Sequence, residues 1–174
     1  QCPSCGSQIT TEGAFHICMA GLSCPAQLKG RLQHYASRTA MNIDTLGEKT
    51  IEQLVERHMV RDIADLYELD VDDLLQLDGY AKKSAQTLHD EIWENTRPSL
   101  DRFVYALGIR HVGEHVARLL ARRLRTFDAI AGAGKKELLA IEEIGEEIAE
   151  SITSFFATKR NTEAIGRLLD FGIA

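Results

Sequence analysis

The sequence predicts a mainly α-helical protein that begins with a small module built on four cysteines. All four cysteines lie between Cys2 and Cys24, in the first part of the 174-residue chain. The rest of the chain repeats one apolar pattern four times, at spacings of 34, 32 and 32 residues. Periods of this length are typical of repeated supersecondary units. The apolar residues within each copy have helical spacing, so we expect helices there.

The spacing of the cysteines predicts a structural metal site. Cys2 and Cys5 form a Cys-x2-Cys knuckle, and Cys18 and Cys24 complete a set of four. Four thiolates around Zn²⁺ close a tetrahedron and leave no position for a catalytic water. Disulfide bonds, which suit secreted chains, and free thiols are the alternatives. His16 is a further candidate ligand, although we interpret it as a loop histidine.

The last of the four cysteines adjoins a predicted helix. Pro25 follows Cys24 directly, and proline is favoured at the first helical position. The helix dipole then favours the thiolate form of Cys24. A module of this size has little core of its own, so we expect it to fold only when metal is bound.

Each of the four copies reads as a helix, a tight turn and a second helix. The aligned segments start at Ile43, Leu77, Ile109 and Ile141, and their turns end at Gly47, Ala81, Gly113 and Gly145. Glycine tolerates positive φ and lets a ligand approach the backbone. At a helix N-terminus the free N–H groups attract anions, so phosphate is the expected ligand. The alternative is four ordinary helix-hairpin turns without a ligand.

The charge distribution decides whether a phosphate-rich partner is plausible. The net charge of −6 argues against nucleic acid at first. Residues 1–40 carry +2 and residues 77–127 carry +3, whereas residues 41–76 carry −7 and residues 128–174 carry −4. One face can therefore be positive. No apolar run approaches the ~20 residues that a membrane helix needs, so we expect no membrane partner.

The side chains around each turn rank the four turns as phosphate sites. Lys82 and Lys83 place the second turn first, whereas Glu146 and Glu147 repel phosphate and make the fourth turn mainly structural. The third turn offers cations on both sides, and its following helix carries a basic stripe that includes Arg125. The candidate DNA-contacting residues are Gly47, Lys49, Gly79, Lys82, Lys83, Arg110, His111, Gly113, His115, Arg118 and Arg122. A solvated basic stripe is the alternative interpretation of the arginines, and Tyr80 and Trp93 are interpreted as core residues.

The repeated turn resembles the helix-hairpin-helix family, whose turns follow the pattern h-x-G-h-G. In that family the motif holds DNA backbone phosphates across the minor groove with little sequence preference. One glycine of the pattern is present in each copy here. Gly79 keeps the first glycine, with Ala81 at the second. The other copies keep the second glycine and have Thr45, His111 and Glu143 at the first.

The cysteine module followed by four hairpins resembles bacterial NAD-dependent DNA ligase over essentially the whole chain. The stretches that carry the resemblance are CPAQLKGRLQHYASRTAMNIDTLGEKTIEQLVE, ALGIRHVGE and IAESITSFF. The resemblance implies a four-cysteine zinc finger over 1–28, hairpins one and two over 29–98, and hairpins three and four over 99–174. We expect two pairs of hairpins that join near Pro98, with Ser99 capping the next helix.

The resemblance also implies an enzyme whose chemistry lies outside this chain. Such a ligase uses NAD⁺ and Mg²⁺ to seal nicks between 5′-phosphate and 3′-hydroxyl ends during replication and repair. Its adenylated lysine lies in a K-x-D-G motif, and no lysine here is followed by x-D-G. We therefore expect no catalytic residue and no activity from this chain alone. The implied partners are nicked duplex DNA, preceding adenylation and OB-fold domains and a following BRCT domain, in a cytoplasmic, nucleoid-associated monomer.

Two other functions remain open at this stage. A repair or recombination protein can carry the same hairpins, but without the preceding cysteine module. A protein-interaction scaffold that binds no DNA is compatible with the net charge of −6. A salt titration of DNA binding separates the scaffold from both DNA-binding functions.

Overall fold

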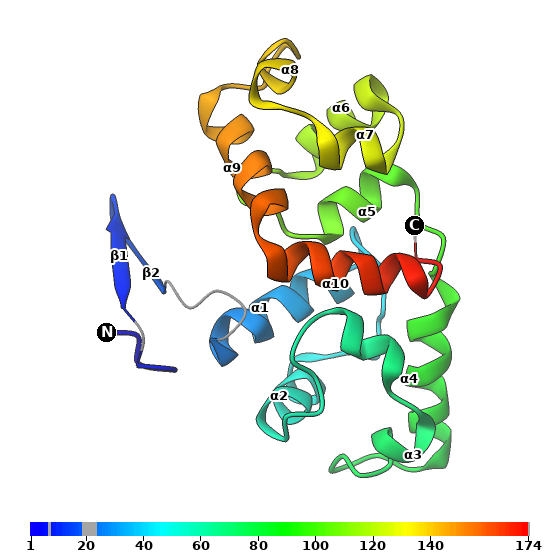
Figure 1. The fold of residues 1–174 in the computed structure, drawn as a ribbon. Helices are drawn as coiled ribbons and strands as arrows, with labels where there is room; N and C mark the ends of the chain where they lie inside the picture. Colours follow the sequence, from blue (N-terminus) through cyan, green and yellow to red (C-terminus); the bar gives the residue numbers. More distant parts are fainter. Residues whose placement is uncertain (7, 19–23, 174) are drawn as a thin grey trace.

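The computed structural model describes residues 1–6, 8–18 and 24–173 and is mainly α-helical, as predicted (Figure 1). An antiparallel hairpin of β1 (Ile9–Glu12) and β2 (Phe15–Cys18) comes first, with Ile9 opposite Cys18. The remaining described elements are α1 (Pro25–Ala36), α2 (Glu48–Glu56), the 3-10 helix η2 (Ala64–Glu68), α3 (Val71–Leu74), α4 (Lys82–Glu94), α5 (Leu100–Ala106), α6 (Glu114–Leu124), α7 (Phe127–Gly132), α8 (Lys135–Leu139), α9 (Glu146–Ala157) and α10 (Lys159–Asp170).

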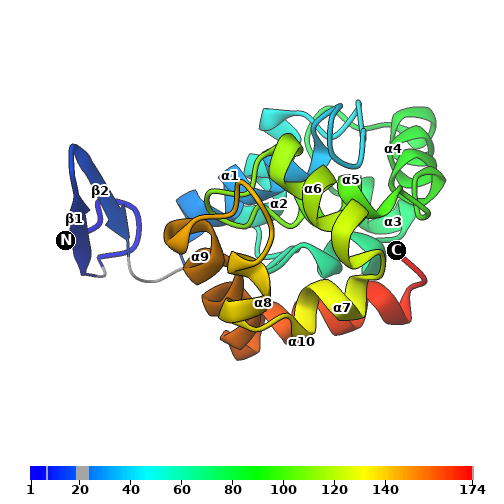
Figure 2. The same cartoon turned by 90° about the horizontal axis from the view of Figure 1, so that it is seen from above.

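The β-hairpin lies beside the helical body and does not pack into its core (Figures 1 and 2). Its turn contains Gly13, whose φ of 59° suits glycine. Phe15 begins β2 and is 73% exposed, and the described residues of this module bury few apolar side chains. Something other than a hydrophobic core must therefore hold the module together.

The four repeated segments form four helical hairpins, as the pattern predicts. The helix pairs in contact are α1 with α2, α3 with α4, α5 with α6, and α8 with α9. The first helices of hairpins two and four are short, at four and five residues. Below, these pairs are called hairpins one to four in chain order.

One contiguous apolar cluster runs through all four hairpins. The repeated positions account for much of it, because each hairpin buries its matching residues. Buried residues of the repeat are Ile51, Ala85, Ala117 and Ala149, then Leu54, Leu88, Leu120 and Ile152. Tyr80 and Trp93, interpreted as core residues, are partly buried and pack against this cluster.

Two elements outside the repeat, η2 and α10, connect distant parts of the helical body. Helix α10 crosses the body and contacts η2, which lies between hairpins one and two (Figure 1). Arg167 of α10 makes ion pairs with Asp62, Asp65 and Glu68 at 2.9, 2.6 and 2.7 Å. The predicted domain boundary at residue 28 falls inside α1, and the boundary at residue 98 falls between α4 and α5. The division into domains stays a prediction.

In the part of the chain that the structure describes, no helix is long and apolar enough to span a bilayer.

Candidate nucleic-acid interface and metal centre

The structure brings the four cysteines together. The sulfur atoms of Cys2, Cys5, Cys18 and Cys24 all lie within 4.8 Å of one another. Cys2 Sγ is 3.8 Å from Cys24 Sγ, and Cys5 Sγ is 3.4 Å from Cys18 Sγ. Zn–S bonds of about 2.3 Å in a tetrahedron separate the sulfurs by about 3.8 Å. The cluster therefore has the donor set and the dimensions that suit a zinc ion.

Backbone hydrogen bonds around the cysteines favour the binding of a cation. The knuckle is closed by a hydrogen bond from Gly6 N to Cys2 O of 2.8 Å, and Gly6 has a φ of 71°. Backbone hydrogen bonds from Ser4 and Cys5 lower the pKa of the Cys2 thiol, which favours the thiolate that binds metal. Cys24 is the N-cap residue of α1, as the sequence predicts.

Two further contacts define the surroundings of the cluster. Gln27 of α1 donates from Nε2 to Cys18 O at 2.8 Å and so connects the helix to the module. His16 Nδ1 lies 3.2 Å from Thr11 Oγ1 across the β-hairpin. Among the described residues, the group of candidate metal ligands contains the four cysteines and not His16.

The second helix of every hairpin begins at the residue that the repeat predicts. The N-cap residues are Gly47, Ala81, Gly113 and Gly145, with φ values of −81°, −128°, −82° and −87°. The expectation that these glycines provide positive φ is therefore wrong. A Cβ atom on any of the three glycines would meet no atom within 4 Å, so neither the backbone conformation nor the packing of the chain requires glycine there.

The positive φ lies instead at the first glycine position of the pattern. Gly79, His111 and Glu143 have φ values of 84°, 62° and 74°. Only Gly79 adopts this conformation without strain, since a Cβ atom disfavours it. Hairpin one has Thr45 at the matching position, where the backbone does not need a positive φ.

Hairpin two presents the most cationic helix N-terminus of the four. Lys82 and Lys83 are the first two residues of α4, and both are exposed. The first turn of α4 contains no acidic residue, unlike those of α2, α6 and α9. In the described part of the chain, no carboxylate pairs with either lysine. This arrangement favours an anion at the N-terminus of α4.

Hairpin one already holds a carboxylate at its turn. Glu91 Oε2 accepts hydrogen bonds from Thr45 N and Thr45 Oγ1, each of 2.8 Å. A phosphate at this turn would compete with Glu91 for the same donors. Lys49 is exposed in the first turn of α2, next to Glu48. The sequence pattern did not point to Glu91, because its contact with Thr45 joins residues 46 positions apart.

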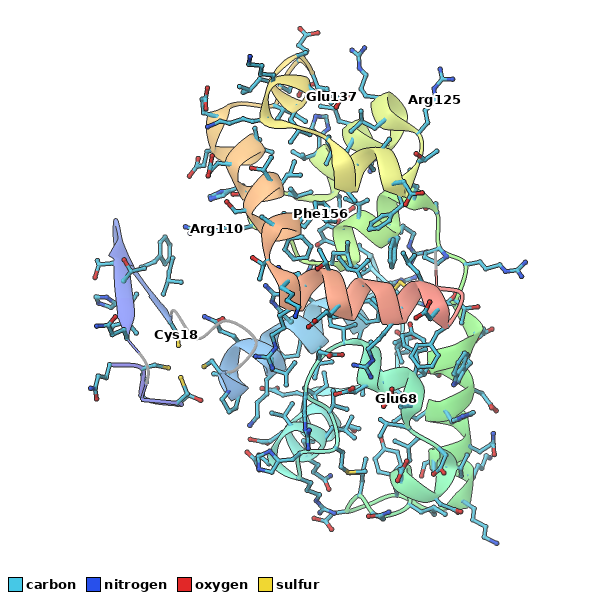
Figure 3. All side chains as sticks on the ribbon, viewed as in Figure 1. Cys18, Glu68, Arg110, Arg125, Glu137 and Phe156 are labelled. Carbon is cyan, nitrogen blue, oxygen red and sulfur yellow. The ribbon has the colours of Figure 1, made fainter. Side chains whose placement is uncertain are left out.

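Hairpins three and four face each other through their turns. His111 Nε2 lies 3.3 Å from Glu147 Oε1, and His115 Nε2 lies 2.8 Å from Glu143 Oε2. The histidines belong to hairpin three and the glutamates to hairpin four. Arg110 is exposed and extends toward the side on which the cysteine module lies (Figure 3).

The basic stripe of α6 is only partly regular. Arg118 and Arg122 lie on the exposed surface of α6, whereas Arg125 is its left-handed C-cap residue with φ of 67°. A hydrogen bond from Ser99 lowers the pKa of the Asp101 carboxyl, and the nearby charge of Arg118 contributes. Ser99 is the N-cap residue of α5, as predicted, but its side chain makes no capping hydrogen bond.

These features define a helix-hairpin-helix protein with an N-terminal four-cysteine module. Residues 37–93 match the family model of the SAM-like helix-hairpin-helix tandem, and residues 102–165 match that of the helix-hairpin-helix motif. The chain is 46% identical over 175 residues to a DNA ligase of Syntrophus aciditrophicus. It is 47% identical over 174 residues to the DNA ligases of Syntrophotalea carbinolica and Salinibacter ruber.

Each of these alignments covers 99% of the chain but only 25–26% of the relative. The chain is therefore similar over nearly its whole length to bacterial DNA ligases, and it spans about a quarter of the length of the curated relatives that it matches.

Proposed function

We propose that this chain is the DNA-binding part of an NAD-dependent DNA ligase that seals nicks between 5′-phosphate and 3′-hydroxyl ends. In this proposal the hairpins hold backbone phosphates of nicked duplex DNA across the minor groove, with little dependence on sequence. The observation that carries it is the exposed N-terminus of α4, where Lys82 and Lys83 meet no carboxylate among the described residues. The DNA ligase relatives support the same function.

The proposal places the chemical steps outside this chain. No lysine here is followed by x-D-G, so the residue that accepts AMP from NAD⁺ would belong to another part of the protein. NAD⁺ and Mg²⁺ would bind there as well. We infer that the chain positions DNA in the cytoplasm for preceding adenylation and OB-fold domains and a following BRCT domain.

We further propose that Cys2, Cys5, Cys18 and Cys24 bind a structural Zn²⁺. The four sulfurs lie within 4.8 Å of one another, and the β-hairpin contributes few buried side chains. A bound zinc ion supplies the folding free energy that so small a module lacks. Its role is to fix the β-hairpin against the start of α1, next to the hairpins that would hold DNA.

Fluorescence anisotropy of the chain with nicked and intact duplexes over a salt series tests the proposal. We expect log K to fall linearly with log salt, with a slope of about −0.9 for each phosphate contact. Replacing Lys82→Gln and Lys83→Gln should then weaken binding and reduce the slope by about 1.8.

The matched control replaces Lys159→Gln and Arg160→Gln. These two cations also occupy the first turn of an exposed helix start, but α10 is not part of the repeated hairpins. We expect a much smaller loss of affinity from this pair. Equal losses from both pairs would indicate a general charge effect, and no binding by the wild-type chain at low salt would favour the protein-interaction scaffold.

A further inference from the structure

Two reciprocal contacts join the turns of hairpins three and four. His111 pairs with Glu147 at 3.3 Å, and His115 pairs with Glu143 at 2.8 Å. In the repeat, His111 matches Glu143 and His115 matches Glu147, each 32 residues apart. The first glycine position of each turn therefore contacts the second helical residue of the other hairpin. Such a crossed arrangement is what a local two-fold relation between the hairpins produces.

The backbone at two of these positions is strained. His111 and Glu143 have φ values of 62° and 74°, a region in which a side chain is disfavoured. Hairpin two uses Gly79 at the same position and avoids this cost. Strain that persists at particular side chains points to a role for those side chains. Here both strained residues carry the contacts between the hairpins.

The contacts also change the charge that DNA would meet. His115 is the second residue of α6, where hairpin two has Lys83 and hairpin four has Glu147. A phosphate that approaches the N-terminus of α6 meets imidazoles already engaged by Glu143 and Glu147. The two carboxylates repel that phosphate and compete with it for the histidine N–H groups.

We propose that Glu143 and Glu147 act as an electrostatic brake on DNA binding by hairpin three. They occupy His111 and His115 until a backbone phosphate displaces them, so hairpin four tunes the affinity of hairpin three. All four side chains are 31–77% exposed, and exposed contacts of this kind are weak, so a phosphate can displace these carboxylates. The inference rests on the proposed function, because the competing ligand is the DNA backbone.

The double variant Glu143→Gln with Glu147→Gln tests the brake by anisotropy with a duplex. We expect roughly tenfold tighter binding and a salt slope steeper by about 0.9 to 1.8, since one or two more phosphate contacts form. The matched control, Glu137→Gln with Glu142→Gln, removes the same charge from exposed carboxylates of the same hairpin. Neither control residue takes part in the two histidine contacts, so its gain should be less than about threefold.

A cycle of variants shows whether the gain passes through the histidines. Adding His111→Gln and His115→Gln to the Glu143→Gln, Glu147→Gln variant should abolish the extra affinity, whereas independent sites would give additive effects. Circular dichroism and thermal melting of each variant show that the hairpins remain folded.

Three outcomes would overturn the brake. Weaker binding by a folded Glu143→Gln, Glu147→Gln variant would mean that the carboxylates position the turns for DNA. An equal gain in the control pair would mean that net charge alone matters, and a gain that survives loss of the histidines would place the effect elsewhere. If no variant binds DNA, the proposed function itself fails, whereas binding by the Glu143→Gln, Glu147→Gln variant alone would support both.

Discussion

At the scale of single residues, Gly30 and Gly79 show that the local backbone conformation decides whether a glycine stabilises or destabilises the fold. Gly79 has a φ of 84°, which a side chain disfavours. Gly30 lies inside α1, where glycine is the poorer helix former. A Cβ atom would meet no atom within 4 Å at either position, so backbone conformation alone separates the two sites.

The same substitution should therefore have opposite effects at these sites. Gly30→Ala should raise the free energy of unfolding by about 1 kcal/mol, because alanine favours the helix. Gly79→Ala should lower it by about 1–2 kcal/mol, because alanine resists the left-handed backbone. Urea denaturation of both variants measures the difference. A loss of stability in Gly30→Ala would show that α1 needs the open space that this glycine leaves.

A buried tyrosine pair makes stability depend on alkaline pH. Tyr35 Oη lies 2.8 Å from Tyr67 Oη, and burial raises the pKa of Tyr67 to about 12, while burial and Tyr67 raise the pKa of Tyr35. The folded state thus retains protons that the unfolded state loses near the ordinary tyrosine pKa of 10.0. Below pH 10 this stabilisation is complete, and it declines as the pH rises toward 12.

We expect the free energy of unfolding to fall by about 1.4 kcal/mol per pH unit for each tyrosine in that range. Tyr67→Phe removes one of the two groups and should halve the slope, at a cost of about 1 kcal/mol at neutral pH for the lost hydrogen bond. Urea titrations at several pH values above 9 provide the measurement. If the free energy of unfolding fell equally steeply with pH in the wild type and in Tyr67→Phe, the tyrosine pair would not be the cause of the pH dependence.

Sequence alone could predict the residues of the site that act within one hairpin. Lys82 and Lys83 follow from their place after a turn, and Cys2 and Cys5 follow from their knuckle. The hydrogen bonds from Thr45 to Glu91 could not be predicted in this way. They depend on how hairpin two packs against hairpin one, which no local spacing encodes.

At the scale of elements, the four main turns were predictable and the short segments were not. The repeat predicts the starts of α2, α4, α6 and α9, because apolar residues follow each turn at helical spacing. The strands β1 and β2 span four residues each, too few for a clear alternating pattern. Helices α3 and α8 are almost as short, so packing rather than propensity determines them.

The cysteine module should depend on metal, whereas the helices should not. Chelation should make residues 1–24 sensitive to protease and leave the helical circular dichroism signal nearly unchanged, since α1 packs Leu28, Leu32 and Tyr35 into the main core. Adding Zn²⁺ should restore protection. A module that resists protease equally with and without chelator would argue against a structural metal.

At the scale of the whole molecule, α10 connects parts of the chain that sequence could not place together. Arg167 lies about a hundred positions from its partners, and its contacts follow from the path of the chain rather than from a motif. Burial alone would lower the pKa of Arg167, but hydrogen bonds to Asp65 and Glu68 and the charge of Asp62 raise it. The guanidinium therefore stabilises carboxylates that would otherwise repel one another.

Removing this cation should destabilise the protein and weaken the packing of α10 between the two halves of the helical body. Arg167→Met leaves Asp62 and Asp65, which are 19% and 16% exposed, close together without a cation. We expect a loss of about 2 kcal/mol, below the 3–5 kcal/mol of a fully buried pair because the site is partly solvated. The control Lys159→Met breaks the exposed pair with Glu163 and should cost less than about 0.5 kcal/mol in urea denaturation.

Arg167→Met should also weaken DNA binding, although Arg167 lies outside the hairpins. Helix α10 reaches hairpins one and two through η2 and contacts α9 of hairpin four, so its loss of anchoring affects all three. Unchanged stability and DNA affinity would show that apolar packing alone fixes α10.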